Sequence, residues 1–208
     1  MSYDRLTAEN AALLLIDHQT GLSNGIQDQS VPEYMTAVTG LVKLAKILNL
    51  PTVASTSASS GPNGPLLPII PSLLPDAPVI HRPGQVNAWD NQEFVEAVRK
   101  TGRKKLIVAG VSTEVCVAFV SLSAVKAGYD VYAVIDASGT WNKLVQEVAI
   151  ARLAQAGVVP MTWVAVLGEL LGDWSQPLGQ EIGVVMMEHL PFYGNLYGSF
   201  LAAKGSAQ

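Results

Sequence analysis

The sequence has little cysteine, little charge and no long apolar run, and each shortage excludes a class of protein. One cysteine among 208 residues rules out an intrachain disulfide and favours a reducing compartment, which we expect to be the cytoplasm. The longest apolar runs, such as residues 11–16, are far shorter than the roughly 18 residues of a membrane-spanning helix. Residues 1–6 lack the basic and then apolar layout of a secretion signal. We therefore expect neither membrane insertion nor secretion.

Basic clusters, metal-binding patterns and nucleotide-binding motifs are also missing. The net charge is −4 and Lys and Arg are scattered, so a nucleic acid partner is not expected. The three histidines, His18, His81 and His189, have no spacing typical of a metal site. Residues 17–25, which follow the first apolar run, lack the pattern Gly-x-Gly-x-x-Gly, and the chain has no P-loop. We expect no metal and no other cofactor.

Apolar residues, by contrast, are abundant. They make up 49% of the chain while charged residues make up 14%, and a chain of this length can bury apolar residues on both faces of a sheet. We expect residues 1–208 to form a single domain that hides further apolar surface in a homo-oligomer. Residues 181–208 are rich in large apolar side chains without a strand-helix rhythm. We expect them to form an arm at a subunit interface, with packing on their own core as an equal alternative.

Short apolar runs alternate with longer helical patterns along the chain. This alternation predicts an α/β fold with a mostly parallel sheet of six strands. Strands are expected at residues 11–16, 52–56, 79–80, 106–111, 131–135 and 158–166. Helices are expected at residues 32–49, 91–101, 114–127 and 141–156. The Pro- and Gly-rich stretch 61–78 is too irregular for a long helix and forms either a pocket wall or a surface loop.

The single cysteine, Cys116, lies where a strand pattern gives way to a helix start. Residues 106–109 form the apolar run, Gly110 is expected in a tight turn, and Thr113 is expected as the N-cap, which puts Cys116 at the third helical position. The free amides and the positive dipole end of a helix start favour thiolate over thiol. Cys116 is therefore a candidate nucleophile, with a small buried apolar residue as the alternative. We expect no Cys–His dyad.

Other reactive side chains follow the ends of predicted strands, where ligands of open parallel sheets bind. Asp17 follows a fully apolar strand, and its poor solvation there suits a proton acceptor, with an Asx turn or an N-cap as the alternative. Arg82 follows the third strand and keeps its proton, so its expected role is electrostatic, with a surface salt bridge as the alternative. Asp136 follows the fifth strand and is expected to cap the next turn.

Five motifs occur in order along nearly the whole chain. They are LIDHQ at 15–19, GPNGP at 61–65, RPGQVNAW at 82–89, AGVSTEVCVA at 109–118 and DASG at 136–139. With these motifs the chain resembles the isochorismatase-like cysteine hydrolase superfamily, and most closely its YcaC-like branch. The resemblance implies a doubly wound sheet with helices on both faces. It also implies a homo-oligomer, because members of the branch tend to form rings that include octamers.

The resemblance further implies a catalytic triad of Asp17, Arg82 and Cys116. The basic residue of the family is usually lysine, and the arginine here is shared with the YcaC-like branch. Family members have a cis peptide bond that falls between Val111 and Ser112 in this chain. The resemblance implies that the N–H groups of Ser112 and Cys116 form an oxyanion hole.

The implied activity is hydrolysis of a small amide or related acyl substrate through a covalent thioester on the cysteine. Nicotinamidases of the superfamily carry a metal site after the second strand, but this chain has Ser-Thr-Ser-Ala-Ser at 55–59 and no metal is implied. Two alternatives stay open: a non-catalytic oligomeric binding or scaffold protein, and an isochorismatase-type hydrolase that does not use the cysteine. Four residues beside the motifs are candidates for the substrate pocket, with core packing as the alternative for the tryptophans: Gln19, Asn87, Trp89 and Trp141.

Overall fold

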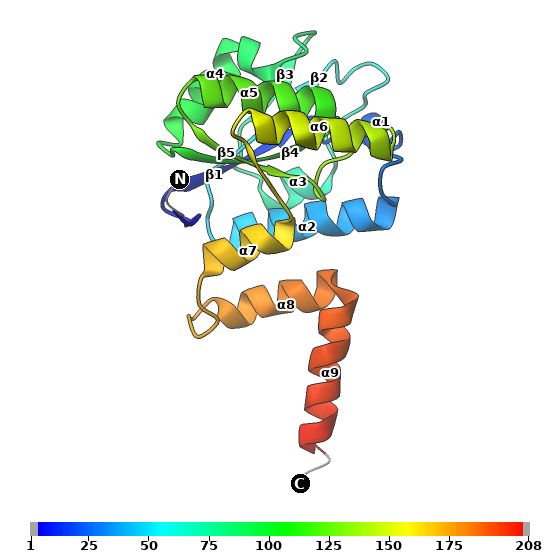
Figure 1. Ribbon diagram of the computed structural model, residues 1–208, viewed down its shortest axis with the longest axis vertical. Coiled ribbons are helices and arrows are strands. Elements are labelled where there is room, and N and C mark those ends of the chain that lie inside the picture. Colours follow the sequence, from blue (N-terminus) through cyan, green and yellow to red (C-terminus); the bar gives the residue numbers. More distant parts are fainter. Residues whose placement is uncertain (1–3, 206–208) are drawn as a thin grey trace.

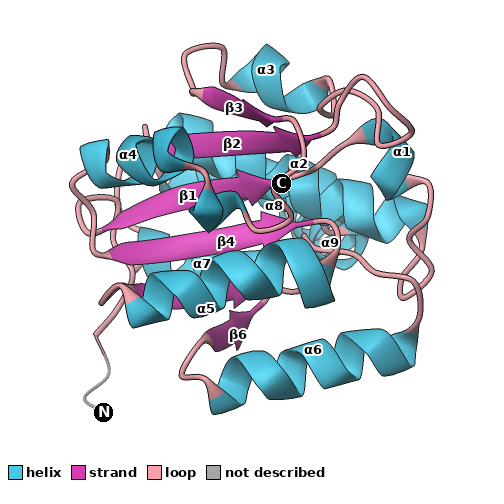
Figure 2. Ribbon diagram, turned by 90° about the horizontal axis from the view of Figure 1, so that it is seen from above, coloured by secondary structure: helices cyan, strands magenta, loops and turns pink. Residues whose placement is uncertain are grey.

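The computed structural model describes residues 4–205, and six strands form one sheet at its centre. The strands are β1 (Ala11–Ile16), β2 (Thr52–Ser57), β3 (Val79–Arg82), β4 (Lys105–Gly110), β5 (Asp130–Val134) and β6 (Val159–Met161). Their order is β3-β2-β1-β4-β5-β6, and each neighbouring pair is parallel. Figure 2 shows β1 to β4 running side by side in the same direction. The predicted α/β fold is confirmed.

Helices cover both faces of this sheet (Figure 1). One face carries α4 (Gln92–Lys100), α5 (Ala118–Lys126) and α6 (Lys143–Gln155). The other face carries α2 (Val31–Ile47), α3 (Ile69–Leu73), α7 (Trp163–Leu171) and α8 (Gly179–His189). The remaining helical segments are α1 (Thr20–Ser23), the 3₁₀ turn η1 (Ala88–Asp90), the π turn η2 (Thr113–Val117) and α9 (Pro191–Gly205).

The two cores meet at β1, which lies between β2 and β4 and is buried along its whole length. Side chains alternate between the two faces of a strand. Leu13 and Leu15 accordingly pack in the core under α2 and α7, whereas Leu14 and Ile16 pack in the core under α4 and α5. An unbroken apolar run is the pattern that such a doubly covered strand requires. The carboxyl end of β1 is therefore held at the middle of the sheet.

The sixth strand is shorter than predicted. β6 ends at Met161, and Thr162 starts α7 by accepting a hydrogen bond from the N–H of Ala165. The predicted strand over residues 158–166 was wrong beyond Met161 because a short apolar run does not separate a buried strand from a buried helix. Trp163 is buried in α7. The apolar run is therefore divided between the end strand β6 and the helix α7.

The segment between β4 and α5 also differs from its prediction. Gly110 is the last residue of β4 and does not form a separate turn; a Cβ there would lie 2.1 Å from the carbonyl oxygen of Ile16. Ser112 occupies the N-cap position in place of Thr113, and the first turn is a π turn in which the N–H of Val117 donates to the carbonyl of Ser112 at 3.1 Å. This widened turn carries the single cysteine.

The C-terminal segment divides into two parts. α8 packs on α2 and buries Ile182, Val185 and Met186, so this part packs on its own core. α9 extends away from the body of the molecule (Figure 1) and buries none of its residues. Residues 206–208 of the predicted arm lie outside the described residues. Within the described part of the chain, no helix is both long and apolar enough to cross a membrane.

Candidate active site

Asp17 stands at the carboxyl end of β1, where the chain turns sharply. Its φ angle is +55°, in the left-handed region that aspartate and asparagine enter more readily than most other residues. Its N–H donates to the carbonyl of Ser55 at 3.1 Å, which holds this turn against β2. The side chain is fully buried. A buried carboxylate must find charged or hydrogen-bonding partners, and three lie around it.

The first partner is Arg82 at the end of β3. Its Nη2 donates to Oδ2 of Asp17, and both side chains are fully buried. Its Nη1 donates to the carbonyls of Gln85 and Val86 in the loop that follows. Arginine keeps its charge at physiological pH. The structure therefore has a buried ion pair here, and the alternative of a surface salt bridge for Arg82 is wrong.

The second partner is Ser55 on β2, which the sequence analysis did not single out. Its hydroxyl donates to Oδ1 of Asp17 at 2.9 Å, and both residues are fully buried. Each oxygen of the carboxylate thus has a donor from a different strand. Ser55 is one of several Ser and Thr residues in β2, so its residue type alone gives little sign of a role.

The third partner is Cys116 in the π turn after β4. Its thiol forms a hydrogen bond with the side chain of Asp17, while the N–H of Ser112 is directed at the sulfur and the charge of Arg82 lies nearby. Burial of the thiol and the negative charge of Asp17 raise the pKa of Cys116 to about 12, and the N–H of Ser112 and the charge of Arg82 offset this only in part. The helix-start amide does favour the thiolate, as the sequence predicts, but burial and Asp17 outweigh it and favour the neutral thiol.

Three predicted residues thus meet at one point. Asp17, Arg82 and Cys116 come from the ends of β1, β3 and β4, and the carboxylate contacts both other side chains. The peptide bond between Val111 and Ser112 is cis. A neutral thiol that donates to a carboxylate can pass its proton along that hydrogen bond when the sulfur attacks an electrophile. The arrangement suits nucleophilic catalysis with Asp17 as proton acceptor.

Two of the predicted pocket residues form hydrogen bonds to other protein groups with their side-chain amides. Gln19 donates from Nε2 to the carbonyls of Ser57 and Gly64 and accepts from the N–H of Ser57, so it ties the end of β1 to the loop after β2. Asn87 accepts from the N–H of Trp89 and donates to the hydroxyl of Ser123. Both side chains hold loops that surround the site.

The two predicted pocket tryptophans lie in different surroundings. Trp89 packs edge to face against Phe94 and Tyr129 in the core under α4 and α5, which gives it a packing role where the sequence had suggested the pocket. Trp141, just before α6, is 39% exposed and its ring lies against Gly25. Trp141 is therefore accessible from the surface, whereas Trp89 is partly buried by its packing partners.

The other polar residues at strand ends have structural partners. Asp136 accepts from the N–H of Trp163 at 2.8 Å, and burial raises the pKa of its carboxyl to about 6. Its role here is structural, but the element that it holds is the start of α7 and not the next turn, as the sequence had predicted. His18 is fully buried against the carbonyl of Ala137, and burial lowers its pKa to about 4. His81 pairs with Thr56. Among residues 4–205, no three His, Cys, Asp or Glu side chains form a group that could hold a metal ion.

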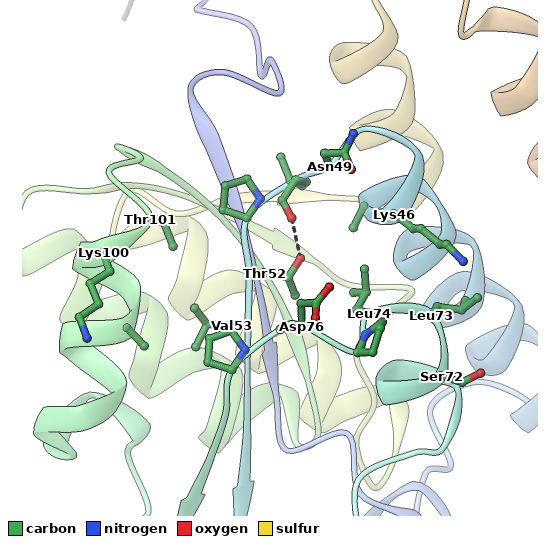
Figure 3. Close-up of a pocket in the computed structure, with 17 residues that line it drawn as sticks. Lys46, Asn49, Thr52, Val53, Ser72, Leu73, Leu74, Asp76, Lys100 and Thr101 are labelled. Carbon is green, nitrogen blue, oxygen red and sulfur yellow. Dashed lines mark hydrogen bonds between the residues drawn. The ribbon is translucent and has the colours of Figure 1, made fainter.

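Two cavities lie away from this cluster. One of about 640 Å³ opens at the amino end of β2, where Lys46, Asn49, Asp76 and Lys100 surround it (Figure 3). Another of about 830 Å³ lies between α2, α6 and the turn from α8 to α9. Neither is lined by Asp17, Arg82 or Cys116. Because ligands of open parallel sheets bind at the carboxyl ends of strands, the cluster is the stronger candidate for the active site.

Residues 11–165 match the family model of the isochorismatase domain. The chain belongs to the isochorismatase family. The matched residues of this isochorismatase-family chain include the three side chains of the cluster and all six strands. The predicted membership of the isochorismatase-like superfamily is confirmed.

Relatives of this isochorismatase-family chain extend the comparison to its whole length. It is 48% identical to the probable hydrolase YcaC of Escherichia coli over 198 residues, which cover 95% of each chain. The structure of that Escherichia coli protein, described as an octameric hydrolase of unknown specificity, matches with a TM-score of 0.94 over 98% of this chain and 99% of the other. The structure of YcaC from Pseudomonas aeruginosa with hexane-2,5-diol and covalent acrylamide also matches, at 48% identity and a TM-score of 0.94, over 96% of this chain and 98% of the other. This chain is accordingly a YcaC-like, isochorismatase-family hydrolase.

Proposed function

We propose that the chain hydrolyses a small amide or a related acyl substrate with Cys116 as the nucleophile. The observation that carries the proposal is the buried carboxylate of Asp17, which holds the ion pair with Arg82 and the hydrogen bond with the thiol of Cys116 at the same time. A nucleophile, a base within hydrogen-bond reach and a third group that orients the base are the parts of an activated nucleophile.

The proposed reaction has two steps. First, Asp17 takes the thiol proton as Sγ of Cys116 attacks the carbonyl carbon; the tetrahedral intermediate then collapses, the C–N bond breaks and the leaving amine receives that proton. Second, Asp17 takes a proton from a water molecule as the water oxygen attacks the carbonyl carbon of the thioester. The C–S bond then breaks, the carboxylic acid leaves, and the sulfur takes the proton back from Asp17. The N–H groups of Ser112 and Cys116 are proposed to bind the oxyanion in both steps.

Arg82 has an electrostatic role in this proposal. A guanidinium does not release its proton at physiological pH, so it takes no part in proton transfer. Its contact with Oδ2 of Asp17 favours the charged form of the carboxylate and fixes one oxygen, which leaves the other side of the group to the thiol. The positive charge also offsets the negative charge that develops on the sulfur and on the oxyanion.

The structure of YcaC from Pseudomonas aeruginosa with covalent acrylamide supports a nucleophilic side chain in this family. Acrylamide adds to thiolates through its activated double bond, and it resembles a small amide in size and polarity. We propose that Cys116 is the residue that reacts with such compounds in this chain, because its thiol is half-buried and has a base in contact.

The experiment that tests the proposal is capture of the thioester. The protein is mixed with a panel of small primary amides and acyl compounds, quenched in acid within seconds and analysed as an intact protein and as peptides by mass spectrometry. We expect at least one compound to add its acyl mass to the peptide that contains Cys116. If amides are hydrolysed without any adduct on that peptide, the mechanism is overturned in favour of an isochorismatase-type hydrolase; if nothing is hydrolysed, a binding or scaffold protein is favoured.

We further propose that, of the predicted arm at residues 181–208, the part that forms the interface of a homo-oligomer is α9, packed on a second copy of the chain. α9 buries no residue of its own, and Phe192, Leu196 and Phe200 are each more than half exposed. An apolar helix face of this kind is typical of a protein-protein interface. The octameric state of YcaC from Escherichia coli supports a ring of eight subunits as the assembly.

The arm is tested by substitutions that change α9 without touching the body of the molecule. We expect Phe192→Ser with Phe200→Ser to lower the molar mass in solution from that of the assembly to that of smaller species, because apolar area at the interface is lost. Asn195→Ser with Ser199→Ala alters polar residues of the same helix and is the matched control. Size-exclusion chromatography with light scattering measures the mass, and an unchanged assembly in the phenylalanine variant would contradict the proposal.

A further inference from the structure

Ser55 donates a hydrogen bond to the Asp17 carboxylate but belongs to neither the predicted triad nor the predicted oxyanion hole. It lies in β2, next to the central strand, where it is in register with Ile16 and is fully buried. Its carbonyl accepts the N–H of Asp17 at 3.1 Å while its hydroxyl donates to Oδ1 of Asp17 at 2.9 Å. The residue therefore holds both the backbone and the side chain of the proposed proton acceptor.

The geometry of the carboxylate shows what the hydroxyl controls. Rotation of an aspartate carboxylate about its last bond is only weakly restricted. Arg82 contacts Oδ2 and so restrains one oxygen from the side of β3, whereas Ser55 restrains the other oxygen from β2. Two donors on two different oxygens fix the plane of the group. The lone pairs that remain can then face the thiol of Cys116 on the side of β4.

We infer that Ser55 is a positioning residue, which orients the Asp17 carboxylate toward Cys116 and stabilises its charged form. This inference rests on the proposed role of Asp17 as proton acceptor. A hydroxyl that donates to a carboxylate stabilises the charged form over the protonated form. Ser55 acts on the reaction only through its contact with Asp17.

The test is the pH profile of the reaction of Cys116 with acrylamide, followed by intact-protein mass spectrometry between pH 3 and pH 9. In the wild-type protein, we expect the rate to fall on the acid side as Asp17 takes up a proton. In Ser55→Ala we expect this acid limb to move to higher pH by roughly one to two units, which corresponds to the loss of one hydrogen bond to a charged group. Ser55→Thr keeps the hydroxyl and is expected to restore the acid limb to its wild-type position.

Ser121→Ala is the matched control. Ser121 is fully buried in α5, and its hydroxyl has no hydrogen-bond partner among the described residues, so this variant also removes a buried hydroxyl but no bond to Asp17. We expect its acid limb to coincide with that of the wild type. If Ser55→Ala and Ser121→Ala move the limb equally, or if neither moves it, Ser55 is not a positioning residue.

Asp17→Asn separates failure of this inference from failure of the proposed function. The amide has no carboxylate to titrate, so the acid limb is expected to disappear. If Asp17→Asn keeps the wild-type limb, Asp17 is not the proton acceptor and the proposed function and the inference fall together. If Asp17→Asn loses the limb while Ser55→Ala keeps it unmoved, Asp17 remains the acceptor and only the inference on Ser55 is overturned.

Discussion

Replacing Cys116 by alanine is expected to lower kcat/KM for any amide that the wild-type protein hydrolyses by about 10⁴-fold or more, the order of loss measured when a covalent nucleophile is removed. Of the side chains of Asp17, Arg82 and Cys116, the thiol is the one suited to form the covalent intermediate, since Asp17 is held in an ion pair and Arg82 cannot act as a nucleophile. The measurement is steady-state turnover of a substrate found in the panel of amides, together with the mass of the protein after exposure to acrylamide.

Ser121→Ala is again the matched control, because it removes one heteroatom from a buried position in α5, the helix that directly follows the π turn of Cys116. We expect it to keep wild-type turnover. Comparable turnover in Cys116→Ala and in the wild-type protein would show that the cysteine is not the nucleophile, and the isochorismatase-type alternative would then explain the activity.

The same variant also has an expected effect on the pH dependence of stability. Burial and Asp17 raise the pKa of Cys116 to about 12, above the value of about 8.5 for an unfolded thiol. The unfolded protein therefore loses this proton first as the pH rises, and the wild-type protein loses stability above that lower value. Cys116→Ala has no such group. We expect the difference in melting temperature between wild type and variant to shift in favour of the variant from pH 8 to pH 10.

Arg82→Met is expected to lower the free energy of unfolding by about 3–5 kcal/mol, the usual cost of leaving one member of a buried ion pair without its partner. The side chains of Arg82 and Asp17 are both fully buried, so water cannot replace the lost contact. The variant Asp17→Asn with Arg82→Met removes both charges and is expected to recover much of this loss. Urea unfolding at one fixed protein concentration measures all three proteins.

A surface ion pair supplies the control for this prediction. Lys43 of α2 contacts Glu188 of α8, and the two side chains are 29% and 50% exposed. Exposed pairs contribute roughly 0–1 kcal/mol, so Lys43→Met is expected to change stability by no more than that. If Arg82→Met costs no more than Lys43→Met, the buried pair with Asp17 is not a significant source of stability, and the proposed electrostatic role of Arg82 is weakened with it.

Several elements could be predicted because local sequence and tertiary environment agree. β1 was predicted with its observed bounds, since only a doubly covered strand needs six consecutive apolar residues. α2 was predicted over residues 32–49 and is observed at Val31–Ile47, where a capping box at Ser30 marks its start. The family motifs placed Asp17, Arg82 and Cys116 together, and the structure brings the three side chains into contact.

Other features could not be predicted because they depend on neighbours that are distant in the sequence. The apolar run 158–166 changes from strand to helix at Thr162 because Trp163 packs on α2 in the core below the sheet. Trp89 stands in a motif, yet its ring packs on Phe94 and Tyr129 and lies partly buried against the core. In both cases one local pattern is compatible with two environments, and packing selects between them.

The sequence by itself determined the fold class, the absence of a disulfide within the chain and the identity of the three groups at the strand ends, because apolar periodicity, residue counts and ordered motifs are local properties. The tertiary structure alone decided the protonation of the cysteine and the role of Ser55. A helix start favours a thiolate, but burial and the charge of Asp17 act over space and raise the thiol pKa instead. Ser55 meets Asp17 because β2 lies beside β1 in the sheet, a contact between residues 38 positions apart.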